Sequence, residues 1–194
     1  MSHRIPAEHP LRRLFTTAVH EAFREQRDLY SPDVASHLTD ELLPDFVHVD
    51  RIYRLRTLRG RRLDELPDMI EVGHEKEGPE RSLEVNRYIG DFVLFMCGFF
   101  PTLVRREAWF APRPMVSRVG GILVQFKEPL DYYIAEGRNA YARAARTAAL
   151  FAPEIHHTYE RLGEKIEGYQ ALLGRAKEYL ESRPEAPDVD GLIA

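Results

Sequence analysis

The segment Tyr88–Phe100, with the sequence YIGDFVLFMCGFF, decides the fold of this chain. It is the most apolar run in the sequence, yet it is well short of the roughly 20 apolar residues that cross a bilayer. An acid, Asp91, lies inside it. An isolated ionised carboxylate in a dry core costs more free energy than a marginally stable domain can spare. We therefore expect a core helix in which Asp91 is paired, hydrogen-bonded, neutralised or at the edge of a cavity.

A helix through this segment places Arg87 one turn before Asp91 on the same face, at the i,i+4 spacing at which side chains meet. We favour a structural ion pair between these two side chains. A polar feature that lines a ligand pocket is the alternative. Catalysis comes last, because no compatible second catalytic group can be assigned. Gly90 and Gly98 lack side-chain bulk, so we expect them to let another helix approach closely.

Composition limits the classes of protein that need to be considered. The chain has 194 residues, of which 44% are hydrophobic and 30% charged, as is ordinary for a soluble globular protein. Its formal net charge of −4 provides no general attraction to phosphates or anionic lipid. The single cysteine, Cys97, excludes an internal disulfide and a cysteine zinc cluster. Because the N-terminus lacks the apolar region of a secretory signal, we expect a cytoplasmic protein without a membrane partner.

Apolar residues at three- and four-residue steps predict helices along most of the chain. The predicted helices are Pro10–Tyr30, Pro32–Leu43, Asp45–Leu58, Leu63–Val72, Ser82–Phe100, Thr102–Phe110, Pro129–Leu150 and Pro153–Ser182. The run VGGILVQF, Val119–Phe126, resembles a strand, but we find no second run to pair with it and assign it to helix or irregular chain. The prediction is a single all-α domain over residues 1–183, an irregular bundle of about seven to nine helices, with a flexible tail over residues 184–194.

A second polar set lies in Phe46–Leu55, FVHVDRIYRL. If this segment is helical, His48 and Arg51 share a face and are candidates for a polar core or a ligand site. Six arginines fall between Arg51 and Arg62, the best nucleic-acid footprint in the chain. No recognised nucleic-acid-binding motif accompanies them, so we expect a solvated or salt-bridged face and keep nucleic-acid contact as the weaker alternative.

The helix predicted over Pro129–Leu150 carries three tyrosines that are candidates for a polar site, Tyr132, Tyr133 and Tyr141. We expect their rings to pack in the core, and a cavity lined by their hydroxyl groups is the alternative. Gly137 belongs to a stripe of small residues on the same helix, and such a stripe favours close packing of a neighbour.

Two E-x-x-H pairs, Glu71 with His74 and Glu154 with His157, have the spacing that supplies two ligands from one helix face in di-iron bundles. Chance placement of Glu and His residues produces such pairs at a similar frequency. Gly73 also weakens the first pair as part of a rigid helix, and a first helical turn favours Glu154 in any case. We therefore predict no metal and no cofactor, and keep a helical metal-dependent enzyme of di-iron type as the alternative.

Three stretches together resemble a set of uncharacterised bacterial helical proteins of similar length. They are DRIY (Asp50–Tyr53), YIGDFVLF (Tyr88–Phe95) followed by GFFP (Gly98–Pro101), and YYIAEG (Tyr132–Gly137) with Tyr141. The similarity covers about residues 30–150. It implies a helical fold and transfers no activity, cofactor or catalytic residue.

The final helical region has apolar residues at a/d steps from Tyr159 to Leu180. We expect this seam to pack on its own bundle, and a homodimer seam is the alternative. The chain contains no nucleophile elbow and no Gly-rich phosphate loop. The sequence therefore favours a non-enzymatic binding or interaction protein with a polar cluster in its helical core. Its expected partners are a second copy or another protein, with a small-molecule ligand as a further possibility.

Overall fold

The computed structural model describes residues 10–46, 55, 63, 65–73, 78–108 and 114–183, and it confirms an all-α helical bundle with one small two-stranded sheet. The helices are α1 (Pro10–Glu25), α2 (Pro32–Ser36), α3 (Leu43–Phe46), α5 (Leu66–Gly73), α6 (Pro79–Phe99), α7 (Pro101–Ala108), α8 (Pro129–Phe151), α9 (Pro153–Glu164) and α10 (Ile166–Glu181). A 3₁₀ turn, η1 (Arg27–Leu29), and a π-helix, η2 (His37–Leu42), lie between the first helices.

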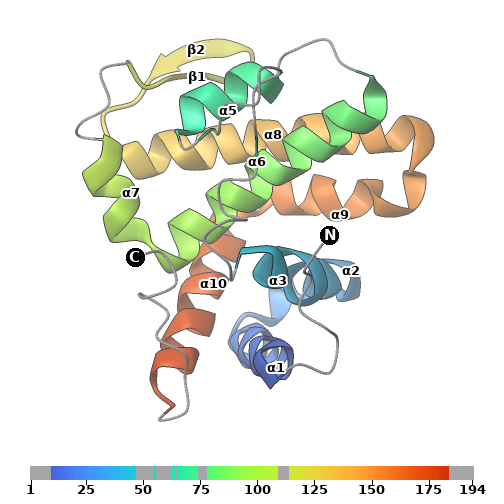
Figure 1. Ribbon diagram of the computed structural model, residues 1–194, viewed down its shortest axis with the longest axis vertical. Coiled ribbons are helices and arrows are strands. Elements are labelled where there is room, and N and C mark those ends of the chain that lie inside the picture. The colour runs from blue at the N-terminus through green and yellow to red at the C-terminus, as the bar shows by residue number, and fades with distance from the viewer. Residues whose placement is uncertain are drawn as a thin grey trace.

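Helix α6 is the central element, as the apolar run predicts. Every residue from Tyr88 to Phe99 is buried, so this helix is covered on all sides. It packs along α8, which packs in turn on α9, while α10 lies against α1 and α6 (Figure 1). Among the described residues, no helix combines the length and apolar character needed to cross a membrane.

The two glycines of α6 allow its neighbours to approach closely, as predicted. A Cβ atom at Gly90 would lie 2.7 Å from the ring of Tyr141, and one at Gly98 would lie 2.7 Å from the Cβ atom of Leu173. Such distances are shorter than atoms of this kind tolerate. Glycine at these two positions therefore sets the distances from α6 to α8 and from α6 to α10.

The helical backbone continues through Pro44, where the sequence predicts an interruption. The segment before this proline is the π-helix η2, in which the N–H of Leu43 bonds to the carbonyl of Leu38, five residues earlier. Proline cannot donate a backbone hydrogen bond, and its ring clashes with the carbonyl four residues before it. A widened turn accommodates both restrictions, and π-turns of this kind are frequent at functional sites.

The assignment of Val119–Phe126 to helix or irregular chain is wrong. Strand β1 (Val116–Val119) pairs antiparallel with β2 (Ile122–Gln125), and Val119 lies opposite Ile122. Gly120 and Gly121 form the turn with φ values of 57° and 87°, the left-handed backbone that two-residue hairpin turns require. The glycine pair thus divides the apolar run, and the missing partner strand is the segment directly before it.

The last helical region is broken at Lys165, whose φ of −114° and ψ of 28° separate α9 from α10. The seam residues on both helices are buried within the chain itself, with exposed fractions of 4% or less: Tyr159, Leu162, Ile166, Tyr169, Leu173, Ala176 and Leu180. The seam therefore packs on its own bundle, as expected, and it is not exposed for a homodimer. Other boundaries also differ from prediction: α1 ends at Glu25, α5 begins at Leu66 and α6 begins at Pro79.

Candidate functional site

Asp91 is buried, with 4% of its surface exposed, and two side chains from distant parts of the sequence bond to it. His37 at the start of η2 places Nε2 2.7 Å from Oδ1 of Asp91. The hydroxyl of Tyr141 on α8 donates to the same oxygen at 2.8 Å. The sequence missed His37, because a contact across 54 residues leaves no local spacing pattern.

Arg87 completes the cluster, but in a different way from the predicted ion pair. Its guanidinium donates to the carboxylate of Glu41 on η2 and to the hydroxyl of Tyr159 on α9, while its charge acts on Asp91. The ring of Tyr159 packs edge-on against His37 at 5.7 Å and stacks on Tyr141 at 6.4 Å. We call His37, Glu41, Arg87, Asp91, Tyr141 and Tyr159 the Asp91 network.

The electrostatics of the Asp91 network shift the pKa values of Asp91 and Tyr141 in opposite directions. Burial acts to raise the pKa of Asp91, but the charge and hydrogen bond of His37, the charge of Arg87 and the hydrogen bond of Tyr141 outweigh it and lower that pKa. Burial first, and then the charge of Asp91, raise the pKa of Tyr141 well above its ordinary value. At neutral pH the network therefore holds a carboxylate that accepts hydrogen bonds and a neutral tyrosine that donates one.

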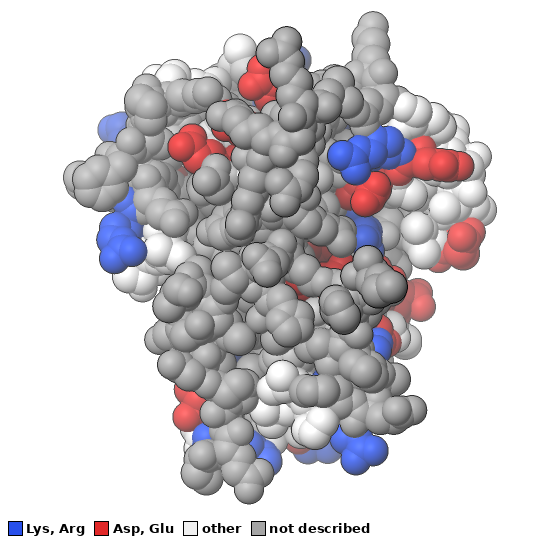
Figure 2. All heavy atoms as spheres, viewed as in Figure 1, with Lys and Arg blue, Asp and Glu red and all other residues white. Residues whose placement is uncertain are grey.

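The Asp91 network joins α6, α8, α9 and η2 through partners that are fixed by the protein. This geometry supports the structural interpretation of Asp91, whereas its use in a ligand pocket stays a prediction. Of the other candidates, Tyr133 is buried on α8. His48 and Arg51 lie outside the described residues, as does most of the segment up to Arg62. On the face shown in Figure 2, the described basic and acidic side chains are interspersed.

A second polar region lies along α8, on the face of the helix opposite Tyr141. Its side chains occur at positions i, i+4, i+7, i+11 and i+14, which is one face of a helix: Tyr132, Glu136, Asn139, Arg143 and Arg146. They line a pocket of about 530 Å³ together with residues of the hairpin and of α5, including Ser117, Leu123 and Ile70. We call this the α8 pocket. Of the predicted site residues, Tyr132 belongs to it.

Arg143 is the least satisfied member of the α8 pocket. Its Nε donates to Oδ1 of Asn86 on α6 at 2.6 Å, whereas its Nη2 is buried and has no hydrogen-bond partner. Burial lowers the pKa of Arg143, against the charge of Glu136, which raises it. Glu136, itself buried, lies two turns earlier on the same helix.

The hairpin is attached to α8 directly beside Arg143. Nδ2 of Asn139 donates to Oγ of Ser117 at 3.0 Å and to the carbonyl of Arg118 at 2.9 Å. These bonds fix β1 beside the polar face of α8, so the wall of the pocket is built by tertiary hydrogen bonds. Sequence reasoning overlooked the region because it interpreted α8 through its tyrosines and small residues. The sequence pattern that could have revealed the region is the helical spacing of Tyr132, Glu136, Asn139, Arg143 and Arg146 on the face opposite Tyr141.

The predicted metal alternative falls only partly within the described residues. His74 lies outside the described residues, and Glu71 is exposed on α5. Within the described part of the chain, His157 is grouped with His156 and Glu160, and neither Glu71 nor Glu154 belongs to that group.

Comparison of the chain with protein-family models, with curated proteins and with solved structures gave no match. The resemblance to bacterial helical proteins therefore gains no support from these comparisons.

Proposed function

We propose that this protein binds a small organic anion in the α8 pocket and does not catalyse a reaction on it. The observation that carries the proposal is the buried Nη2 of Arg143, which has no acceptor. A buried donor without a partner costs about 1–3 kcal/mol, and more when the group is charged. A carboxylate or phosphate oxygen at this position would remove that cost on binding, because the planar guanidinium can donate hydrogen bonds to two oxygens side by side.

The lining of the α8 pocket indicates the kind of anion. Arg118, Arg143 and Arg146 contribute three positive charges against one negative charge from Glu136, so the lining favours a negative group. Ile70, Leu123 and other apolar side chains form the remaining wall. The volume of about 530 Å³ lies within the range of ordinary ligand pockets. A carboxylate or phosphate ester with a short apolar body fits this combination.

Calorimetric titration with octanoate, phenyl phosphate and inorganic phosphate tests the proposal. We expect an organic anion to bind more tightly than inorganic phosphate, because it also covers the apolar wall. Arg143→Gln should weaken that binding at least tenfold, and Arg143→Lys should weaken it less, because it keeps the charge and loses the fork. Arg105→Gln changes an exposed arginine on α7 and should leave the affinity unaltered.

Failure of both organic anions to bind, or equal binding by the wild type and Arg143→Gln, would contradict the proposal. The expected cytoplasmic location and the expected self-association or protein partner are part of the same proposal and rest on the sequence.

A further inference from the structure

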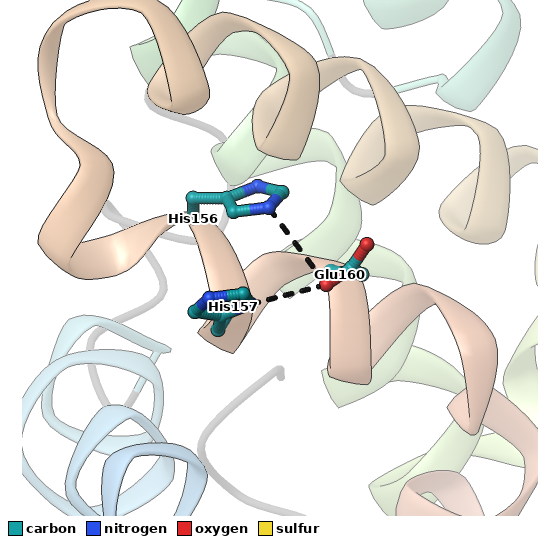
Figure 3. A group of neighbouring side chains, drawn as sticks. All are labelled: His156, His157 and Glu160. Atoms are coloured by element: carbon teal, nitrogen blue, oxygen red, sulfur yellow. Dashed lines mark hydrogen bonds and ion pairs between the residues drawn. The ribbon is translucent and has the colours of Figure 1, made fainter.

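Three possible metal ligands lie together near the start of α9. His156, His157 and Glu160 project from neighbouring positions of the helix, and Figure 3 shows both rings directed toward the carboxylate. One ligand atom from each residue lies within 4.8 Å of the other two. His156 and Glu160 are one turn apart, and His157 stands beside them at the i,i+3 spacing.

The hydrogen bond of His156 to α8 leaves its other ring nitrogen free. Its Nδ1 lies 3.2 Å from the carbonyl oxygen of Ala145, and a carbonyl can only accept, so Nδ1 carries the proton. In the neutral ring Nε2 then has a lone pair, and this nitrogen is the one that faces Glu160. A backbone carbonyl that holds the second nitrogen of a histidine is the usual support of a metal-binding imidazole.

The distances between the ligand atoms are close to those around a bound ion. Nε2 of His156 is 3.8 Å from Oε2 of Glu160, too far for a hydrogen bond, and Nδ1 of His157 is hydrogen-bonded to the same oxygen at 3.2 Å. Ligands about 2.0–2.1 Å from a tetrahedral ion are separated by about 3.3 Å. A small rotation of the Glu160 side chain, of which 47% is accessible, is enough to bring its carboxylate closer to His156.

The surroundings leave part of the coordination sphere open. His156 and Glu160 lie at the wall of a pocket of about 440 Å³ between α8 and α9. Arg138 and Arg146 of α8 line the other side, and Glu164 adds a negative charge beside Glu160. Nε of Arg138 is buried and has no hydrogen-bond partner. An ion at the wall would thus have protein ligands on one side and, on the other, space for an anion that the arginines can hold.

We propose that His156, His157 and Glu160 bind one divalent ion of the zinc class through two imidazoles and one carboxylate, with a further position open to solvent or to an anion. Imidazole nitrogen favours zinc, copper and nickel over calcium or magnesium. The set differs from the E-x-x-H pairs, because Glu160 and His156 take the place of Glu154. The inference does not depend on the α8 pocket, so each can fail without the other.

The test is calorimetric titration of the full chain, free of a His tag, with Zn²⁺. We expect one zinc per chain, bound at least tenfold more weakly by His157→Gln and by Glu160→Gln. Both substitutions are on exposed side chains, so the variants should fold, and circular dichroism verifies this. His20→Gln removes an exposed histidine of α1 and is the matched control, with affinity equal to that of the wild type.

Titration with Co²⁺ gives a second readout. The wild type should show the intense visible absorption of a four-coordinate ion, and His156→Gln should lose it. Zinc affinity that is the same in the wild type, His157→Gln and Glu160→Gln would overturn the proposal, because the ion would then be bound elsewhere on the chain. Absence of zinc binding by the wild type would overturn it as well.

Discussion

Two polar regions lie on opposite faces of α8, and they treat buried charge in opposite ways. Tyr141 enters the Asp91 network, in which carboxylate, imidazole, guanidinium and hydroxyl groups bond to one another. Arg143, two residues later, enters the α8 pocket with one nitrogen bonded and another unpartnered. Fully satisfied polar networks make a fold rigid, whereas an unsatisfied buried group calls for an explanation such as a ligand. The two faces of α8 thus differ in whether their buried polar groups have hydrogen-bond partners.

Removal of the carboxylate at the centre of the Asp91 network should have the largest effect. Asp91→Ala leaves His37 buried without its acid and removes the negative charge that acts on Arg87, and breaking a buried pair in this way costs about 3–5 kcal/mol. Urea unfolding of the wild type and the variant measures the difference. Asp131→Ala removes an exposed acid from the first turn of α8 and should cost less than about 1 kcal/mol. Equal losses in the two variants would show that the network is not structural.

The next largest loss of stability is expected for Gly90→Ala, which tests whether the Asp91 network depends on the close approach of α6 and α8. Gly90→Ala places a methyl group 2.7 Å from the ring of Tyr141, which also holds Asp91, and overpacking of this kind costs about 1–3 kcal/mol. Thermal unfolding measures the loss.

Gly174→Ala on α10 is the control for the same substitution. A Cβ atom added at Gly174 would lie 3.6 Å from its nearest neighbour, the carbonyl oxygen of Gly98, which is an ordinary van der Waals distance. Because alanine favours a helix by about 1 kcal/mol over glycine, this variant should be as stable as the wild type or more so. If Gly174→Ala were destabilised and Gly90→Ala were unchanged, the inference that Gly90 lies at a tight contact and Gly174 does not would be wrong.

The class of fold was predictable because it depends on local pattern. The apolar run at Tyr88–Phe100, proline at helix starts and alanine in α8 are all visible in the sequence, and the structure has helices at these places. The hairpin was missed, although its Gly120-Gly121 turn is also a local feature, because Val119–Phe126 was interpreted as one continuous run, whereas the glycine pair divides it and Val116–Val119 is the partner strand.

The site was predictable only in part, because its contacts are not local. Burial of Asp91 followed from its neighbours in sequence, and Arg87 and Tyr141 were among the predicted residues. His37 joins them through the π-turn before Pro44, and no spacing rule connects residue 37 to residue 91. The α8 pocket depends on where the hairpin docks, which the sequence does not reveal once the hairpin itself is missed.

Acid should reduce the contribution of Asp91 to the unfolding free energy. Comparison with Asp91→Asn separates this loss from general acid denaturation. The folded protein lowers the pKa of Asp91, so this group contributes stability that is present above its unfolded value of about 3.9 and is lost as the pH falls toward the folded value. Asp91→Asn lacks this contribution. The difference in unfolding free energy between the wild type and Asp91→Asn should therefore shrink as the pH falls below about 5. Urea titrations at several pH values measure it, and a constant difference down to pH 3 would contradict the lowered pKa.

The smallest loss of stability is expected for Arg143→Gln in the α8 pocket, because a guanidinium nitrogen of Arg143 has no hydrogen-bond partner. Arg143→Gln gives up the bond from Nε to Asn86, worth about 1 kcal/mol, but it also removes the buried Nη2 that has no acceptor. The two changes oppose each other, so the variant should unfold within about 1 kcal/mol of the wild type, although Arg143 is as centrally placed on α8 as Tyr141. A loss as large as that of Asp91→Ala would show that Arg143 belongs to the framework. A small loss means that the fold does not need this guanidinium, which is what a group reserved for a ligand requires.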